Sequence, residues 1–123
     1  MQEALLLAQQ AADVDEVPVG AIVVQGEQII GSGFNQPIRS CDPTAHAEIV
    51  ALRSASQSRQ NYRLPETTLY VTLEPCTMCL GAMIHARVGR LVFGAAEPRA
   101  GAIVSQASLV DAQYFNHQLS YTQ

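Results

Sequence analysis

The sequence has no lysine and only three cysteines among its 123 residues. It also lacks any apolar run near the roughly 20 residues that a membrane-spanning helix needs, which argues against a membrane protein. Its first residues do not combine a basic segment with an apolar core, so we expect no secretory signal. An odd, small number of cysteines without such a signal argues against a disulfide framework and favours a reducing compartment. We therefore predict a cytoplasmic protein.

The charge balance is acidic, and every basic side chain except histidine is an arginine. Seven arginines stand against eleven acidic residues, which gives a formal net charge of −4 and a pI of about 5.2. Proteins that hold nucleic acid through many phosphate contacts are usually basic. A nucleic-acid-binding role would therefore need a local arginine patch, a few base contacts or the help of a second subunit.

No repeats, low-complexity tracts or linkers interrupt the chain, so we expect one compact unit. The periodicity of apolar residues predicts a first helix over residues 1–12, with Leu5, Leu6, Ala8 and Ala12 toward the core. A second helix is expected from about residue 44 to 56, capped by Asp42 or Thr44, and a third after Pro75.

Runs of β-branched and aromatic residues predict the strands. We expect them at 20–24, 29–34, 67–72 and 90–94, with a last strand within 117–123. A two-residue hairpin turn that begins at Gly26 should join the first two strands. Residues 35–44 should be rich in turns, and 95–116 should contain a short helix. Strands that alternate with helices indicate a three-layer α/β/α fold with a central mixed sheet of about five strands.

Two short motifs carry most of the chemistry that the sequence offers. One is His46-Ala47-Glu48, and the other is Pro75-Cys76-Thr77-Met78-Cys79. One imidazole and two thiols are a three-ligand set for zinc, which leaves the fourth position of a tetrahedral site to water or substrate. Zinc lowers the pKa of such a water, and a nearby carboxylate can move its protons. The motifs therefore predict a zinc site at His46, Cys76 and Cys79, with Glu48 as the proton carrier.

The expected secondary structure favours the same site. Cys76 and Cys79 are three residues apart at a helix start, so their sulfurs point to the same side. The positive end of the helix dipole favours the thiolates that a metal requires. Because His46 also lies near a helix start, we expect the site between two helix N-termini.

Each half of the pattern has a plainer interpretation. A lone C-x-x-C is also typical of a redox pair or of half a zinc knuckle. A single histidine is more often structural, and Glu48 could simply be solvated. No second C-x-x-C follows, and Cys41, His85 and His117 are poorly spaced for a fourth ligand. The combination of H-x-E with P-C-x-x-C, however, is the mark of zinc nucleobase deaminases.

Longer blocks of sequence extend this match over nearly the whole chain. They are 16–21 (EVPVGA), 35–38 (NQPI), 42–49 (DPTAHAEI), 61–64 (NYRL), 69–76 (LYVTLEPC), 81–87 (GAMIHAR) and 92–95 (VFGA). The chain resembles the bacterial tRNA-specific adenosine deaminases of the zinc-dependent cytidine and deoxycytidylate deaminase superfamily. The resemblance implies a cytidine-deaminase-like fold and a single zinc-dependent deaminase domain over residues 1–123, active as a homodimer.

The resemblance also implies a reaction and its residues. One Zn²⁺ per subunit would be bound by His46, Cys76 and Cys79, and the substrate would be the wobble adenosine of an arginine tRNA. Hydroxide on zinc would attack C6 of the adenine, while Glu48 carries protons to the ring and to the departing ammonia. Asn35 would hydrogen-bond the flipped base, and the backbone N–H groups of Ala47 and Cys76 are further candidate contacts.

Two features depart from the family pattern. The C-terminal helix that usually helps to engage the anticodon loop is not among these 123 residues. The loop at 97–101 (EPRAG) usually contains a lysine, for which Arg99 is the candidate replacement. The other candidates for phosphate contacts are Arg53, Arg59, Arg63, Arg87 and Arg90.

Two alternatives remain at this point. The acidic charge favours a deaminase of a free nucleobase or nucleoside, such as cytosine or guanine. A non-catalytic zinc domain is the other alternative, and it leaves Glu48 without a duty.

Overall fold

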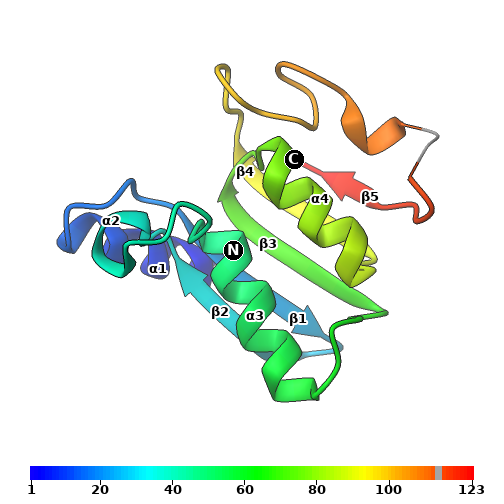
Figure 1. The fold of residues 1–123 in the computed structure, drawn as a ribbon, viewed down its shortest axis with the longest axis horizontal. Helices are drawn as coiled ribbons and strands as arrows, with labels where there is room; N and C mark the ends of the chain where they lie inside the picture. Colours follow the sequence, from blue (N-terminus) through cyan, green and yellow to red (C-terminus); the bar gives the residue numbers. More distant parts are fainter. Residues whose placement is uncertain (113–114) are drawn as a thin grey trace.

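The computed structural model describes residues 1–112 and 115–123, which form a mixed sheet of five strands between helices (Figure 1). The strands are β1 (Gly20–Gln25), β2 (Gln28–Phe34), β3 (Thr67–Leu73), β4 (Arg90–Ala95) and β5 (Ser120–Thr122). The helices are α1 (Gln2–Asp13), α2 (Pro37–Ser40), α3 (Ala47–Arg59) and α4 (Thr77–Ala86), with one 3₁₀ turn, η1 (Leu109–Asp111). The predicted three-layer α/β/α fold is confirmed.

The sheet topology determines where the functional loops meet. The strand order is β2-β1-β3-β4-β5. β1 is antiparallel to both β2 and β3, while β3, β4 and β5 are parallel. Because β2 and β3 are both antiparallel to β1, they run in the same direction and end at the same edge of the sheet. The segments that lead from β2 to α3 and from β3 to α4 therefore begin side by side (Figure 1).

The β1–β2 hairpin forms as its sequence predicts. Gln25 pairs with Gln28 across a two-residue loop, and Gly26 takes a φ of +63°. This left-handed conformation costs glycine little, since it has no Cβ. The turn sets the register of the first two residue pairs, and an irregularity between Val23 and Val24 shifts the register by one residue beyond them.

Glycines on β2 allow α3 to lie unusually close to the sheet. A Cβ on Gly31 would lie 2.5 Å from the carbonyl oxygen of Ala51 and 2.5 Å from the nitrogen of Ala55. A Cβ on Gly33 would meet Val50 at 2.6 Å. Since backbone atoms of α3 cannot move aside independently, these two positions require glycine.

The predicted inner face of α1 is right for Ala8 and wrong for Leu5, Leu6 and Ala12, because α1 also packs closely on the sheet. Ala4, Ala8 and Ala11 are the buried residues, whereas Leu5 and Leu6 are 54% and 61% exposed and Ala12 is exposed as well. α1 packs on Gly20 of β1, where an added Cβ would overlap the carbonyl of Ala4. Only alanines fit so near to β1, so apolar size alone pointed to the wrong face.

The main core lies between the sheet and the helices α3 and α4. Its fully buried side chains include Leu69 and Val71 of β3, Phe93 of β4, and Leu80 and Met83 of α4. Burying a side chain of this size contributes about 1.5–3 kcal/mol. The two helices are thus fixed on one face of the sheet.

The connection from β2 to α3 differs from its prediction. It contains the short helix α2, and α3 begins at Ala47 with His46 as its N-cap residue, rather than near residue 44 with Asp42 or Thr44 as the cap. The Asp42 carboxylate instead accepts hydrogen bonds from the N–H and hydroxyl groups of Thr44, at 2.8 and 2.7 Å. This local turn competes with helix capping, as is common for aspartate.

The short helix that was expected within 95–116 is the 3₁₀ turn η1, although residues 113 and 114 of that range lie outside the described part. None of the helices in the described ranges combines the length and apolar character needed to cross a membrane.

Candidate active site

Three predicted metal ligands meet at the edge of the sheet where β2 and β3 end. His46 is the N-cap residue of α3, and Cys76 is the N-cap residue of α4. The Sγ atoms of Cys76 and Cys79 lie 3.6 and 3.5 Å from Nδ1 of His46, and the three ligand atoms lie within 4.8 Å of one another. In a tetrahedral site with ordinary zinc–sulfur and zinc–nitrogen bonds, sulfur and nitrogen are about 3.6 Å apart. The donor set and its geometry therefore fit one zinc ion.

The two thiols have strongly different acidities. A hydrogen bond from Cys79 lowers the pKa of Cys76 to about 5 against the effect of burial, and N–H groups at the start of α4 and the charge of His46 add to this. The same hydrogen bond, together with burial and the nearby Glu48, raises the pKa of Cys79. Cys76 is thus the more readily ionised sulfur, and a dication beside both would favour the thiolate of each.

Glu48 lies in the first turn of α3 and is only 4% exposed. Burial is the main cause that raises the pKa of its carboxyl; its own backbone N–H opposes this, and the charge of Cys76 raises it further. A carboxyl whose pKa is shifted toward neutrality can both accept a proton and return it. Its position and acidity are suited to the predicted role as proton carrier.

Asn35 is buried directly after β2 and faces the start of α3. Its side-chain Oδ1 accepts the backbone N–H of Ala47 at 3.1 Å. Its backbone N–H donates to the backbone carbonyl of Val19 at 3.0 Å. The amide therefore caps α3 from a distance, in the place of a conventional N-cap side chain. The base-contact roles expected for Asn35, for the N–H of Ala47 and for the N–H of Cys76 stay predictions.

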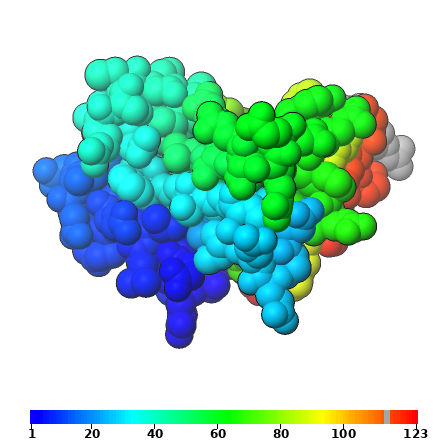
Figure 2. All heavy atoms as spheres, turned by 90° about the horizontal axis from the view of Figure 1, so that it is seen from below, coloured from blue at the N-terminus to red at the C-terminus, as the bar shows by residue number. Residues whose placement is uncertain are grey.

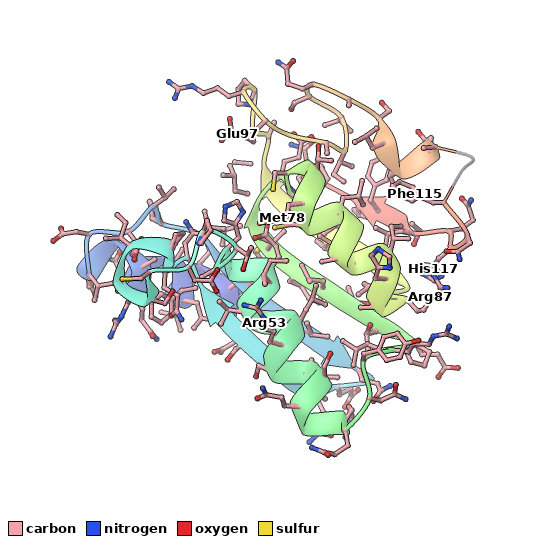
Figure 3. The ribbon with its side chains drawn as sticks, viewed as in Figure 1. Arg53, Met78, Arg87, Glu97, Phe115 and His117 are labelled. Carbon is pink, nitrogen blue, oxygen red and sulfur yellow. The ribbon has the colours of Figure 1, made fainter. Side chains whose placement is uncertain are left out.

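These residues surround a cavity of about 200 Å³. His46, Glu48 and Cys76 contribute its chemically active lining, and Asn35 and Val19 lie on the side of β1 and β2. The far side is formed by Leu73 and by two residues, Glu97 and Ala100, of the loop that follows β4. Figure 3 shows Glu97 on this loop, beyond the end of α4 at which Met78 lies.

The wall residues Val17, Val19, Leu73, Glu74 and Ala100 were not predicted from the sequence. One signal was available for Glu74, because a charged residue between a buried strand and a ligand-bearing helix is unusual. The local sequence gives no sign that the other residues line a cavity, because they are brought together only when the chain folds.

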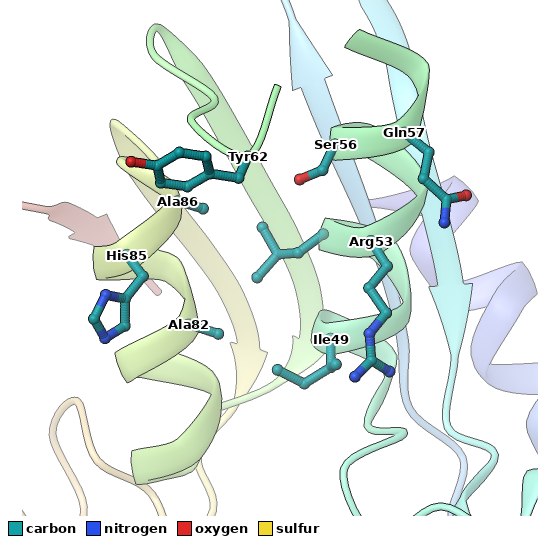
Figure 4. A pocket seen from close by; sticks show the side chains of 9 residues that line it. Ile49, Arg53, Ser56, Gln57, Tyr62, Ala82, His85 and Ala86 are labelled. Atoms are coloured by element: carbon teal, nitrogen blue, oxygen red, sulfur yellow. The ribbon is translucent and has the colours of Figure 1, made fainter. Parts of the chain in front are cut away.

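A larger hollow of about 440 Å³ lies away from the ligands, between α3 and α4. Ile49, Leu52 and Ala82 give it an apolar floor, while Arg53, Tyr62 and His85 stand at its rim (Figure 4). In the space-filling view the surface dips beside the green atoms of the segment that contains α3 (Figure 2). Because this hollow, the α3–α4 groove, holds no ligand set, we assign the chemistry to the smaller cavity.

Several candidate phosphate-binding arginines already have partners within the chain. Arg53 approaches the Asp42 carboxylate at 3.4 Å, Arg87 donates to Asn116 at 2.9 Å, and Arg90 donates to Thr122 at 3.1 Å. Of these contacts only Arg53–Asp42 is an ion pair, and an exposed pair contributes little to stability. Arg99 is exposed on the loop that borders the cavity.

Comparison with known proteins agrees with the geometry. The family model for the cytidine and deoxycytidylate deaminase zinc-binding region matches residues 1–95. A tRNA-specific adenosine deaminase of Haemophilus influenzae is 53% identical over an alignment of 123 positions that covers 99% of this chain and 71% of that protein.

Solved structures give the same result. A tRNA:A34 deaminase, studied for A-to-I editing at the wobble position, is 40% identical with a TM-score of 0.96, over 99% of this chain and 88% of the other. A guanine deaminase from Bacillus subtilis is 38% identical with a TM-score of 0.75, over 77% and 61% of the two chains.

Proposed function

Because this chain belongs to the zinc-binding cytidine and deoxycytidylate deaminase family, we propose that it is a hydrolase that converts adenosine to inosine at the wobble position of an arginine tRNA. The observation that carries the proposal is the cluster of His46, Cys76 and Cys79 with the buried carboxyl of Glu48 in the same small cavity. This combination suits hydrolytic removal of an amino group from a flat ring.

In the proposed reaction the residues of the cavity have separate roles. His46, Cys76 and Cys79 would hold the zinc, which when bound would supply an acidified water as the nucleophile for C6 of the adenine. Glu48 would take one proton of that water to the ring nitrogen N1 and pass the second to the amino group, which would leave as ammonia. The water oxygen becomes the carbonyl oxygen of inosine, so the atoms balance. Asn35 holds the ring in place through its side-chain amide.

A tRNA substrate is supported by sequence identity. The Haemophilus influenzae tRNA-specific adenosine deaminase is 53% identical and the tRNA:A34 deaminase 40% identical, each over 99% of this chain, whereas the Bacillus subtilis guanine deaminase is 38% identical over 77%. The second candidate, deamination of free guanine or a related base, is supported by the same catalytic cluster and by the acidic net charge.

The test is inosine formation by the purified protein on an anticodon stem-loop of arginine tRNA. Free adenosine, cytidine, cytosine and guanine are assayed in parallel, and Glu48→Ala is the inactive control. Conversion of the wobble adenosine alone supports the proposal. Rapid turnover of a free base instead would reject the tRNA substrate and establish the second candidate.

We also propose that the chain forms a cytoplasmic homodimer through the α3–α4 groove. The support is the apolar floor of the groove and its position beside the helices that carry the ligands, which fits the dimer that the family resemblance implies. Introducing a charge on that floor with Ala82→Arg should shift the protein to monomers in analytical ultracentrifugation. Glu27→Arg on the β1–β2 turn is the matched control, and a wild-type monomer at micromolar concentration would refute the dimer.

A further inference from the structure

A second buried carboxylate, Glu74, lies beside the active-site cavity without a part in the proposed reaction. It directly follows β3, stands two residues before Cys76 and is 3% exposed. Its backbone N–H donates to the carbonyl of Ala95 at 2.8 Å, so the main chain at this point is paired with the end of β4.

The side chain of Glu74 binds the loop that forms the far wall of the cavity. One carboxylate oxygen accepts the N–H groups of Ile103, Val104 and Ser105, at 3.0, 2.8 and 3.0 Å. The other oxygen accepts the N–H of Glu97 at 3.1 Å and the hydroxyl of Ser105. Five donors from both ends of residues 97–105 thus converge on one carboxylate, and we call this segment the wall loop.

Hydrogen bonds to a charged group are among the strongest in proteins, and a buried carboxylate needs them. Burial alone would raise the pKa of Glu74, but the Ser105 hydroxyl and the N–H groups of the wall loop lower it to about 2. The carboxylate is therefore charged at neutral pH and well matched to its donors.

The wall loop is shaped around this carboxylate. Gly101 lies against Glu74 so closely that an added Cβ would overlap the carboxyl group. The N–H of Ala102 donates to the carbonyl of Pro75 at 2.9 Å, which attaches the loop to the residue before Cys76. Glu97 and Ala100, which line the cavity, belong to the segment held in this way.

We propose that Glu74 is a positioning residue for substrate binding: it holds the wall loop so that Glu97 and Ala100 close their side of the cavity. It acts through the loop, because both of its carboxylate oxygens accept hydrogen bonds from residues 97–105. The identity of the substrate in this inference rests on the proposed deaminase function, whereas the position of the loop does not.

Glu16 is a matched carboxylate outside the wall loop. It is also buried, and it accepts the N–H groups of Ile38 and Arg39 in α2, at 3.3 and 2.8 Å. The substitution Glu16→Gln is therefore a control that loosens α2 instead of the wall loop by the same chemical change.

Limited trypsin digestion measures the position of each loop separately. The chain has no lysine, and Arg99 in the wall loop and Arg39 in α2 are both exposed. Glu74→Gln places an amide NH₂ group against the N–H donors of the wall loop, so the loop should open more often. Losing one charge-assisted hydrogen bond corresponds to a factor of roughly ten in this opening, so cleavage after Arg99 should become roughly tenfold faster. Cleavage after Arg39 should not change. Glu16→Gln should give the reverse pattern.

Gly101→Ala provides a second variant in case Glu74→Gln folds poorly. Its methyl group displaces only the end of a flexible side chain, so the fold should persist while the carboxylate loses its donors. It should also accelerate cleavage after Arg99. Unchanged cleavage after Arg99 in both variants would overturn the proposal and assign the loop's position to the burial of Ile103.

Kinetics with the anticodon stem-loop test the link to substrate. In the zinc-loaded variants KM should rise about tenfold while kcat falls less than about threefold, because the ground-state fit is lost and the proton carrier is intact. A lower kcat at constant KM would indicate only a loss of folded protein, and this result would overturn the positioning role. A wild-type protein that is inactive on every substrate would reject the proposed function, while the digestion pattern would still decide the role of Glu74 in the loop.

Discussion

The Oδ1 atom of Asn35 accepts the N–H of Ala47 at 3.1 Å, so a residue directly after β2 caps the helix that carries Glu48. This contact links the end of β2 to the start of α3 within the cavity lining. It also gives Asn35 two duties, a structural one through its oxygen and a proposed binding one through its NH₂ group.

The two duties of Asn35 can be separated by two substitutions. Asn35→Ala should lose the cap and lower the free energy of unfolding by about 1 kcal/mol, and it should also raise KM. Asn35→Asp keeps an oxygen for the N–H of Ala47 but loses the amide donor, so stability should be retained while activity falls. Urea unfolding and stem-loop kinetics measure the pair. Equal activity of the aspartate variant and the wild type would exclude the base contact.

Glu48→Gln should keep the fold and the metal while losing proton transfer. Glutamine has nearly the same shape but cannot carry a proton, so kcat should fall by about 10² to 10⁴-fold. Zinc content measured by atomic absorption should remain that of the wild type. Loss of metal from this variant would show that Glu48 is a ligand rather than the proton carrier.

Cys79→Ser should lose zinc and stability together, because metal-binding free energy is also folding free energy at such a site. Cys41→Ser is the matched control, since Cys41 is exposed and outside the ligand cluster. A chelator should lower the Tm of the wild type toward that of Cys79→Ser and leave Cys79→Ser itself unchanged. A normal zinc content in Cys79→Ser would contradict the assignment.

The pKa of Glu74, about 2 against an ordinary value of 4.5, predicts a pH-dependent stability difference. A carboxyl with a lowered pKa in the folded state contributes stability that is complete above the unfolded pKa and is lost as the pH falls through the folded one. The excess stability of the wild type over Glu74→Gln should therefore be constant from pH 7 to about 5 and shrink between pH 4.5 and 2. Comparing the two proteins at each pH cancels effects common to both, such as metal release. A difference that does not vary with pH would contradict an ionised, donor-bound Glu74.

Two glycine substitutions should have opposite effects on stability. Gly31→Ala would force a methyl group against the backbone of α3 and should lower the free energy of unfolding by roughly 2 kcal/mol or more. Gly81 lies within α4, and a Cβ there would meet nothing within 4 Å. Gly81→Ala should therefore stabilise the protein by about 0.5–1 kcal/mol, since alanine favours helices. Thermal unfolding distinguishes these outcomes, and a neutral Gly31→Ala would mean that α3 can retreat from the sheet.

The elements whose sequence and tertiary context agree were predictable. The ends of β1, β3 and β4 lie within one residue of the predicted ends. Runs of buried β-branched residues such as Ile22 and Val23 strongly favour strands. The turn at Gly26 followed from glycine chemistry, and α4 followed from its apolar stripe. The three candidate metal ligands were predicted from their types and order alone, and the structure places their ligand atoms within 4.8 Å of one another.

The predictions that were wrong concern features that depend on contacts between segments far apart in the sequence. The inner face of α1 is set by the closeness of Gly20, which no local periodicity reports. The start of α3 is set by His46 and by a cap from Asn35, 12 residues upstream, so local capping rules favoured Asp42 or Thr44. The role of Glu74 depends on a loop about 30 residues further along.

The placement of the ligands has a consequence for how the molecule comes apart. His46 precedes the helix packed on β2, and Cys76 precedes the helix that connects β3 to β4. An ion bound to both would cross-link residues 30 positions apart, as a disulfide does, and would reduce the conformational freedom of the unfolded chain. The β1–β2 half and the β3–β4–β5 half of the sheet would then be expected to unfold together rather than one after the other.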